Sequence, residues 1–122
     1  MLNIEEVREI CLALPQVEES TPFAAFGSDD VVFKVGGRMF ALLCVDDGRK
    51  VALKCDPDLA AELRDELPDT VEPAYHFNTK YWNQVHYDHG AITEAWMRHW
   101  VRHAYDEVVK KLTRKVRAEL GI

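Results

Sequence analysis

The sequence predicts an α+β fold in which an antiparallel β-sheet, a meander followed by a later strand, is covered on one face by helices from the two ends of the chain. Gly36-Gly37 separates two apolar segments in the manner of a β-hairpin. Helical periodicity dominates residues 3–14 and 94–112. The chain has 122 residues, 48% of them hydrophobic and 30% charged. That is enough for a single domain, residues 1–122, whose core needs neither a metal nor a disulfide.

The first expected element is a helix that begins after Asn3, whose side chain can cap it. Pro15 helps to end this helix. Its apolar side consists of Ile4, Val7, Ile10, Cys11 and Leu14. Its other side is an acidic ridge of Glu5, Glu6 and Glu9. Residues 15–22 are predicted to form a loop that leads into a short strand at residues 23–26.

A meander of three strands is predicted next. Residues 31–35 and 38–45 form a hairpin, because the two glycines between them supply the positive φ that a two-residue turn requires. A second turn at Asp46-Asp47-Gly48-Arg49 leads into a strand at residues 50–55. The expected register pairs Val35 with Arg38, Phe33 with Phe40, and Leu42 with Leu53.

This register divides the meander into two faces. The core face, which helices must cover, consists of Val31, Phe33, Val35, Phe40, Leu42, Cys44, Val51, Leu53 and Cys55. The outer face consists of Val32, Lys34, Met39, Ala41, Leu43, Ala52 and Lys54. Lys34 and Lys54 are therefore expected to project from the same surface of the sheet.

A second helix is expected to begin at Asp56-Pro57, with aspartate as the cap and proline at the first helical position. Its apolar stripe consists of Leu59, Ala60, Leu63 and Leu67, and Pro68 closes it. After a loop over residues 68–81, residues 82–88 alternate as the last strand. Val85 and Tyr87 then face the core, and Trp82 and His86 join the two lysines on the outer face.

The C-terminal helical region begins at Thr93 and Glu94. One apolar stripe should pack on the sheet: Met97, Val101, Ala104, Tyr105, Val108 and Leu112. A break is predicted near Thr113, followed by a short helix over residues 114–120.

The formal net charge is −6, but the charges are unevenly distributed. Residues 1–30 hold seven acidic residues and one arginine, whereas residues 98–117 hold seven basic and two acidic residues. A negative net charge weakens a nucleic-acid hypothesis, and a local basic face could rescue it. The plainer interpretation of the basic segment is a solvated amphipathic helix. Three unclustered cysteines, no long apolar segment and no signal peptide indicate a cytoplasmic protein that does not enter membranes.

Catalysis and metal binding have little support in the sequence. The cysteines fall on predicted buried faces, no serine lies in a nucleophile motif, and the acidic pairs lie in turns. His99 and His103 have the spacing of a metal pair, but no third ligand is evident, and His86 and His89 merely flank a turn. Gly36-Gly37 is expected to form a hairpin turn and not a phosphate-binding loop followed by a helix, and no cofactor is expected. The sequence therefore favours a protein that is not an enzyme and holds neither metal nor cofactor.

The segment 73–88 is the best candidate for a functional site. It contains three of the four tyrosines together with Trp82, His76, Asn78 and Lys80. Hydrogen-bond donors, a cation and an aromatic plane are the groups with which proteins bind nucleic acids or nucleotides. The alternative is that His76 and Asn78 bond the backbone of their own loop, which is the commoner role of such residues.

Four motifs in a fixed order resemble the MmcQ/YjbR family over nearly the whole chain. They are Val32-Phe33-Lys34-Val35-Gly36-Gly37-Arg38-Met39-Phe40-Ala41, Leu53-Lys54-Cys55-Asp56-Pro57, Tyr75-His76-Phe77-Asn78-Thr79-Lys80-Tyr81-Trp82-Asn83 and Ala104-Tyr105-Asp106. The chain departs from that family at Ala104, where serine is usual, and at Ala74, where glycine is common. The resemblance implies an antiparallel sheet covered by helices, similar to frataxin (the CyaY-like fold), and DNA binding.

Three functional hypotheses follow. In the first, the chain binds nucleic acid through one outer surface of the sheet. Lys34, Lys54 and Lys80 contact phosphate, Trp82 stacks on bases, and His76 and Asn78 supply hydrogen bonds. In the second, a protein-interaction or frataxin-like metal-handling module uses the acidic residues Glu5, Glu6, Glu9, Glu18 and Glu19. In the third, an adaptor binds a protein partner through exposed Trp96 and Trp100.

Overall fold

The computed structural model describes residues 1–46 and 48–122. Its helices and strands follow in the order α1 (Ile4–Leu12), β1 (Glu18–Ser20), the 3₁₀ helix η1 (Ala24–Phe26), β2 (Val31–Val35), β3 (Arg38–Leu43), β4 (Lys50–Lys54), α2 (Pro57–Glu66), β5 (Val71–Pro73), β6 (Trp82–His86), α3 (Glu94–Val109) and α4 (Arg114–Leu120). The predicted turn at residues 46–49 includes Asp47, which lies outside the described residues.

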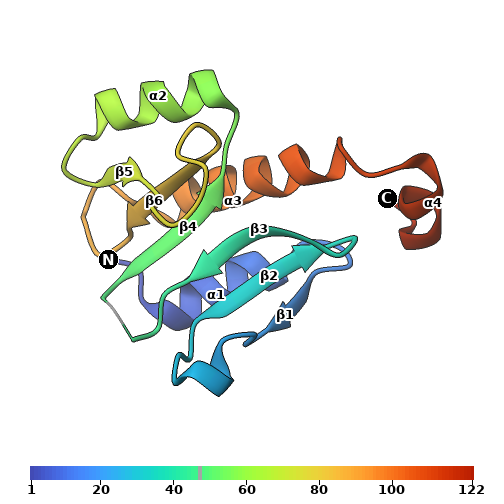
Figure 1. Ribbon diagram of the computed structural model, residues 1–122. Coiled ribbons are helices and arrows are strands. Elements are labelled where there is room, and N and C mark those ends of the chain that lie inside the picture. The colour runs from blue at the N-terminus through green and yellow to red at the C-terminus, as the bar shows by residue number, and fades with distance from the viewer. Residues whose placement is uncertain (47) are drawn as a thin grey trace.

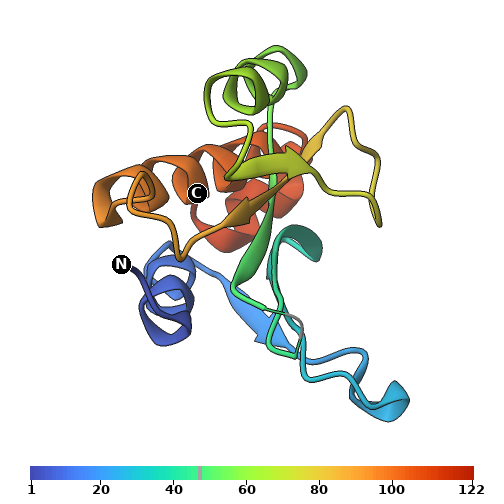
Figure 2. The ribbon, with the colours of Figure 1, turned by 90° about the vertical axis from the view of Figure 1, so that its left-hand side faces the viewer.

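One antiparallel sheet organises the described part of the chain. Its strand order is β1-β2-β3-β4-β6-β5. The helices α1 and α3 pack behind the sheet as drawn in Figure 1, and α2 packs beside β5 and β6. Figure 2 shows the same arrangement from the side. The predicted α+β class, with N-terminal and C-terminal helices on one face, is confirmed.

The predicted starts of the helices are confirmed by their N-terminal capping residues. Asn3 Oδ1 accepts a hydrogen bond from the Glu6 N–H at 2.9 Å, and a Glu6 carboxylate oxygen accepts one from the Asn3 N–H at 3.1 Å. The Asp56 side chain caps α2 directly before Pro57. Threonines cap α3 and α4. The predicted C-terminal stripe is buried from Met97 on α3 to Leu112, which lies just after this helix.

The Gly36-Gly37 turn is also as predicted, because Val35 pairs with Arg38 across it. The two glycines have φ of 60° and 80°, which favour residues without a Cβ. Their surroundings differ. A Cβ at Gly36 would lie 2.7 Å from a methyl carbon of Leu112, whereas a Cβ at Gly37 would have no neighbour within 4 Å.

These surroundings make the two glycines a matched pair for a stability test. Gly37→Ala should cost about 1–2 kcal/mol, which is the strain of a left-handed alanine. Gly36→Ala should cost at least about 1 kcal/mol more, because buried Leu112 must also move. Urea unfolding of both variants measures the difference. Equal losses would show that the segment after α3 does not pack against this turn in solution.

A β-bulge makes part of the predicted register wrong. Phe33 pairs with Ala41 and Lys34 with Met39, so Phe40 is an extra residue on β3. Phe40 and Ala41 both lie in the core with no exposed surface. Beyond the bulge the alternation is shifted by one residue.

The shift exchanges the two leucines that follow. Leu43, predicted on the outer face, is buried in the core, whereas Leu42, predicted in the core, packs with the outer residues Ala52 and Trp82. Leu42 accordingly pairs with Ala52, and the predicted pair with Leu53 is wrong. Ala41, also predicted outside, is in the core, and Cys44 lines a cavity on the outer face. Because both leucines are apolar, the hydrophobic pattern could not reveal the shift.

Two short edge strands were also missed. β1 lies within the predicted loop at residues 15–22, and β5 lies within the predicted loop at residues 68–81. The strand expected at residues 23–26 is instead the 3₁₀ helix η1. β1 is Glu-Glu-Ser and fully exposed, so backbone hydrogen bonds to β2 stabilise it without any apolar pattern. None of the described helices is long and apolar enough to span a bilayer.

Candidate functional site

The segment 74–81 connects β5 to β6 and lies beside the C-terminal end of β4. The Asn78 side chain accepts a hydrogen bond from the Lys80 N–H at 3.1 Å, and its carbonyl accepts one from the Tyr81 N–H at 3.0 Å. The Arg64 guanidinium of α2 donates to the Thr79 carbonyl at 3.1 Å. The alternative weighed for Asn78 is therefore observed: this side chain stabilises its own loop.

Three lysine ammonium groups surround the ring of Tyr81. The Nζ atoms of Lys54, Lys80 and Lys111 lie 5.5, 5.6 and 5.4 Å from its centroid. They come from the end of β4, the segment that connects β5 to β6, and the segment just after α3. Each lies within cation–π distance of the ring.

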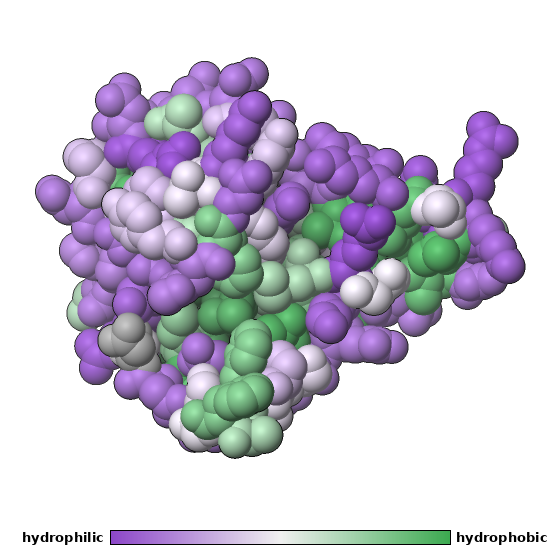
Figure 3. Space-filling view, viewed as in Figure 1, coloured by the Kyte–Doolittle hydropathy of each residue, from purple (hydrophilic) through white to green (hydrophobic). Residues whose placement is uncertain are grey.

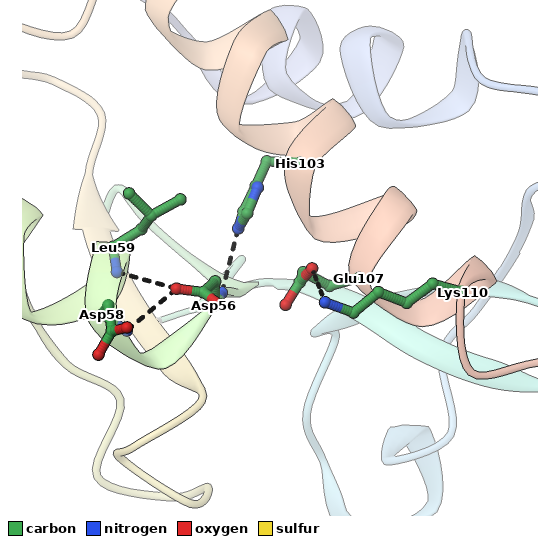
Figure 4. Close-up of polar contacts among 6 residues, drawn as sticks. All are labelled: Asp56, Asp58, Leu59, His103, Glu107 and Lys110. Atoms are coloured by element: carbon green, nitrogen blue, oxygen red, sulfur yellow. Dashed lines mark hydrogen bonds and ion pairs between the residues drawn. The ribbon is translucent and has the colours of Figure 1, made fainter.

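Arg38, at the start of β3, completes this group of positive charges. It borders a recess of about 210 Å³ together with Lys54 and Lys111. We refer to Arg38, Lys54, Lys80 and Lys111 as the cationic cluster. Glu107 also borders this recess, but it is paired with Lys110 at 2.5 Å. The close-up in Figure 4 shows that pair.

The positive charges of the cluster repel one another. The pKa of Lys54 is lowered, first by burial and then by the charges of Lys111 and Arg38, and Glu107 only partly opposes this. Mutual repulsion of these cations is unfavourable, and the nearby Glu107 carboxylate offsets it only in part. A bound anion would therefore stabilise the charged form of Lys54.

Lys54 and Trp82, both predicted on the outer face of the sheet, lie side by side on that face. Lys54 pairs with Trp82 across β4 and β6, and its Nζ lies 5.4 Å from the indole centroid. Lys34 lies on the same face but on β2, and β3 separates it from β4. At the usual strand spacing its backbone is about 10 Å from that of Lys54. Lys34 is therefore peripheral to the cluster.

Trp82 is not an open stacking plane. It is only 6% exposed, and the ring of Phe77 stacks on it with centroids 4.6 Å apart. This corrects the expectation that its indole would be free to stack on a base. The accessible aromatic groups of the segment are Tyr75, which is exposed, and Phe77 and Tyr81, which are half-buried. The aromatic composition of residues 73–88 indicated the segment, but only packing determines which ring is covered.

A cavity of about 370 Å³ lies on the same outer face, next to the cluster. The sheet residues Leu42 and Ala52 line it together with Phe77, His76 and Phe23. Figure 3 shows this face of the molecule as a hollow whose floor is hydrophobic, with polar groups around it. We refer to this hollow as the outer-face cavity. His76, one of the predicted site residues, therefore borders a recess and not the cationic cluster.

His103 links α3 to the start of α2. Its Nε2 accepts a hydrogen bond from the Asp56 N–H at 3.1 Å, and the Asp56 carboxylate caps α2 through the N–H groups of Asp58 and Leu59 (Figure 4). This bond requires an unprotonated Nε2. Asp56 comes two residues after Lys54, so the same bond also fixes the end of β4.

This bond predicts a pH-dependent stability. Burial lowers the pKa of His103, His99 and Lys110 lower it further, and Glu107 and Asp56 oppose them. The unfolded chain therefore takes up this proton more readily than the folded chain. The stabilisation is complete above the ordinary histidine pKa of about 6.5 and is lost as the pH falls towards the lowered value. Urea unfolding between about pH 7.5 and 5 should show the loss, because these values bracket that pKa.

The control for this effect is His103→Ala. It should lose about 1–2 kcal/mol at neutral pH, because it leaves a backbone N–H without its partner. Its stability should also depend less on pH than that of the unaltered protein. Identical pH dependences in the two proteins would assign the effect to other groups.

Some residues of the two alternative hypotheses are engaged in the fold. Glu6 forms the cap of α1, and Glu19 pairs with Arg8. No three His, Cys, Asp or Glu side chains converge as a metal site anywhere in residues 1–46 and 48–122. Trp96 and Trp100 are half-buried and pack against the core, so the prediction that they are exposed is wrong.

The buried thiols are poor nucleophiles. Burial raises the pKa of both Cys11 and Cys55 to about 12. At neutral pH they are therefore protonated, and they behave as small apolar groups.

Comparisons with known proteins agree with the fold. A family profile described as YjbR matches residues 12–107. An Escherichia coli O157:H7 protein, described as uncharacterized protein YbdF, is 33% identical over 112 residues, which are 91% of this chain and 88% of that protein. The crystal structure of the Deinococcus radiodurans protein DR2400, with the domain DUF419, is 35% identical with a TM-score of 0.88. The structural match covers 100% of this chain and 90% of the DR2400 chain. The profile match includes every residue of the cationic cluster except Lys111.

Proposed function

This chain belongs to the YjbR family, and we propose that it binds nucleic acid through the cationic cluster, which lies where the end of β4 meets the segment after α3. The supporting observation is the convergence of three lysine ammonium groups within 5.6 Å of the Tyr81 ring centroid. The anion that such a group of cations favours is the phosphate of a nucleic-acid backbone.

The charge distribution supports a local site. The chain as a whole has a formal charge of −6, which repels nucleic acid at long range. The four residues of the cluster come from four separate segments of the chain and lie together only in the folded protein. Their attraction for phosphate is concentrated where the sheet presents aromatic side chains beside them.

The cluster residues have distinct parts in this proposal. Lys80 and Lys111 are exposed and contact phosphate directly. Lys54 is half-buried against Trp82, so its ammonium group lies at the base of the site. The Tyr81 ring lies within cation–π distance of all three ammonium groups. The function is binding without catalysis, and DNA is the nucleic acid that the family resemblance favours.

Fluorescence anisotropy with labelled single-stranded and double-stranded DNA tests this proposal. We expect binding that weakens by more than about 10-fold between about 50 and 200 mM salt, because the cluster displaces counterions from phosphates. Lys111→Gln should weaken binding, and Lys115→Gln should not. Both lysines are exposed and near the C-terminus, but only Lys111 lies at Tyr81. Absence of binding at low salt, or binding that is indifferent to salt, would refute the proposal.

A further inference from the structure

We infer that the nucleic acid bound at the cationic cluster is single-stranded and that the outer-face cavity receives one of its unpaired bases. This inference rests on the proposed function. The cavity has a volume of about 370 Å³, within the range of small-molecule sites in proteins. Its lining and its position relative to the lysines support the assignment.

The apolar part of the lining matches the faces of a nucleobase, which are flat and apolar, and Asp30 and Lys50 are among the other lining residues. The floor consists of Leu42, Ala52 and Ala74, and the rings of Phe23 and Phe77 also border the cavity. Two of the three floor residues are alanines, so the floor remains deep. Bases that leave a stack are commonly held between aromatic and apolar side chains.

The edge of a base is polar, and the cavity supplies a polar group at fixed orientation. Gln84 lines the cavity, and its Nε2 donates a hydrogen bond to a carboxylate oxygen of Glu72 at 2.7 Å. This bond fixes the carboxamide and leaves its oxygen as an acceptor for a base amino or imino group. His76 borders the same cavity and is exposed. Its ring can donate or accept a hydrogen bond at the cavity mouth.

The cavity and the cationic cluster are connected through β4 and through the stacked rings of Phe77 and Trp82. Ala52 of the cavity floor and Lys54 of the cluster are two residues apart on β4 and share a face. This separation is about 7 Å along a strand, a distance that one nucleotide spans between its base and its phosphate. Phe77 of the cavity stacks on Trp82, which in turn lies under the Lys54 ammonium group. A base in the cavity would therefore have its phosphate within reach of Lys54.

A base inside a duplex cannot enter this cavity, because its partner strand and its stacked neighbours hold it. Two further aromatic side chains lie next to residues of the cavity lining. Phe26 is 86% exposed and is the last residue of η1, directly before which lies Phe23, and Tyr75 is 74% exposed and follows Ala74. Exposed rings of this kind offer stacking planes for the neighbouring bases of a single strand.

Three labelled probes test this inference: an oligothymidylate of about 12 nucleotides, its duplex with oligodeoxyadenylate, and thymidine monophosphate. The single strand should bind at least about 10-fold more tightly than the duplex or the mononucleotide. Ala52→Leu, which fills the floor, and Phe23→Ala, which removes a ring, should each weaken single-strand binding by about 10-fold. Because they remove no charge, neither should change the slope of log affinity against log salt.

Lys111→Gln is the matched variant, because it should reduce that slope and leave the cavity intact. If both cavity variants bind the single strand normally while Lys111→Gln weakens it, the cavity inference fails and the proposed function stands. The inference also fails if the duplex binds as tightly as the single strand, or if the mononucleotide binds more tightly than the strand. If no probe binds at low salt, the proposed function fails as well. Phe23 is 42% exposed, so its truncation tests the cavity without disturbing the core.

Discussion

Replacement of Lys54, Lys80 and Lys111 together by glutamine is expected to remove most of the salt-dependent affinity for single-stranded DNA. Each lysine that neutralises a phosphate contributes about 0.7 to the slope of log affinity against log salt. Loss of all three should therefore reduce the slope by about 2, and the affinity at low salt by about 100-fold or more. Anisotropy titrations at several salt concentrations measure both quantities.

A control with the same loss of charge is available on α4. Arg114, Lys115 and Arg117 are exposed residues of this helix, and they can also be replaced together by glutamine. Because they lie outside the cationic cluster, the slope should change little in this variant. Equal losses in the two triple variants would mean that the overall charge, and not the arrangement around Tyr81, attracts the nucleic acid. Thermal unfolding of each variant verifies that it is folded.

Phe40→Ala is expected to produce the largest loss of stability, about 3–5 kcal/mol. Phe40 is the extra residue of the β-bulge and has no exposed surface. Its ring meets Tyr105 of α3 edge to face at 5.7 Å and also neighbours Phe33 at 6.5 Å. Truncation leaves a cavity where the sheet packs on α3, and the surrounding strands cannot close it. Urea unfolding measures the loss.

Met39→Ala is the matched control on the opposite face of the same strand. Met39 is half-buried and packs with the outer residues around Trp82. Its truncation should cost roughly half as much or less, because its site opens towards solvent. Similar losses for the two variants would contradict the inward orientation of Phe40 that the bulge produces.

The bulge also determines which leucine of β3 faces the outer surface of the sheet. Because one residue is inserted before Leu42, that side chain turns outward, where it lines the outer-face cavity, and Leu43 turns into the core. In the register expected from the sequence, Leu43 would have occupied the outer face instead. The core position of Phe40 and the shape of the proposed base site therefore depend on the same local irregularity.

Local physical rules were sufficient for much of this fold. The caps at Asn3 and Asp56, the Gly36-Gly37 turn and the apolar stripe of α3 each depend on residues close together in the chain. The hydrogen bonds and backbone angles that define these features are formed within a few residues, so composition and spacing determine them. The sequence also correctly placed Lys54 and Trp82 on one face of the sheet, and the structure shows that their strands are neighbours.

The tertiary structure alone decided the features that join distant segments. The exposed strand β1 exists because β2 supplies its hydrogen-bond partners, and the sequence Glu-Glu-Ser carries no sign of this. Trp82 is covered because Phe77 folds onto it, and Lys111 joins Lys54 because α3 ends beside β4. A one-residue bulge between two apolar neighbours leaves the hydrophobic pattern unchanged, yet it reverses which side chains face the core. Spacing along the chain determines local geometry, whereas a site assembled from four separate segments depends on long-range packing.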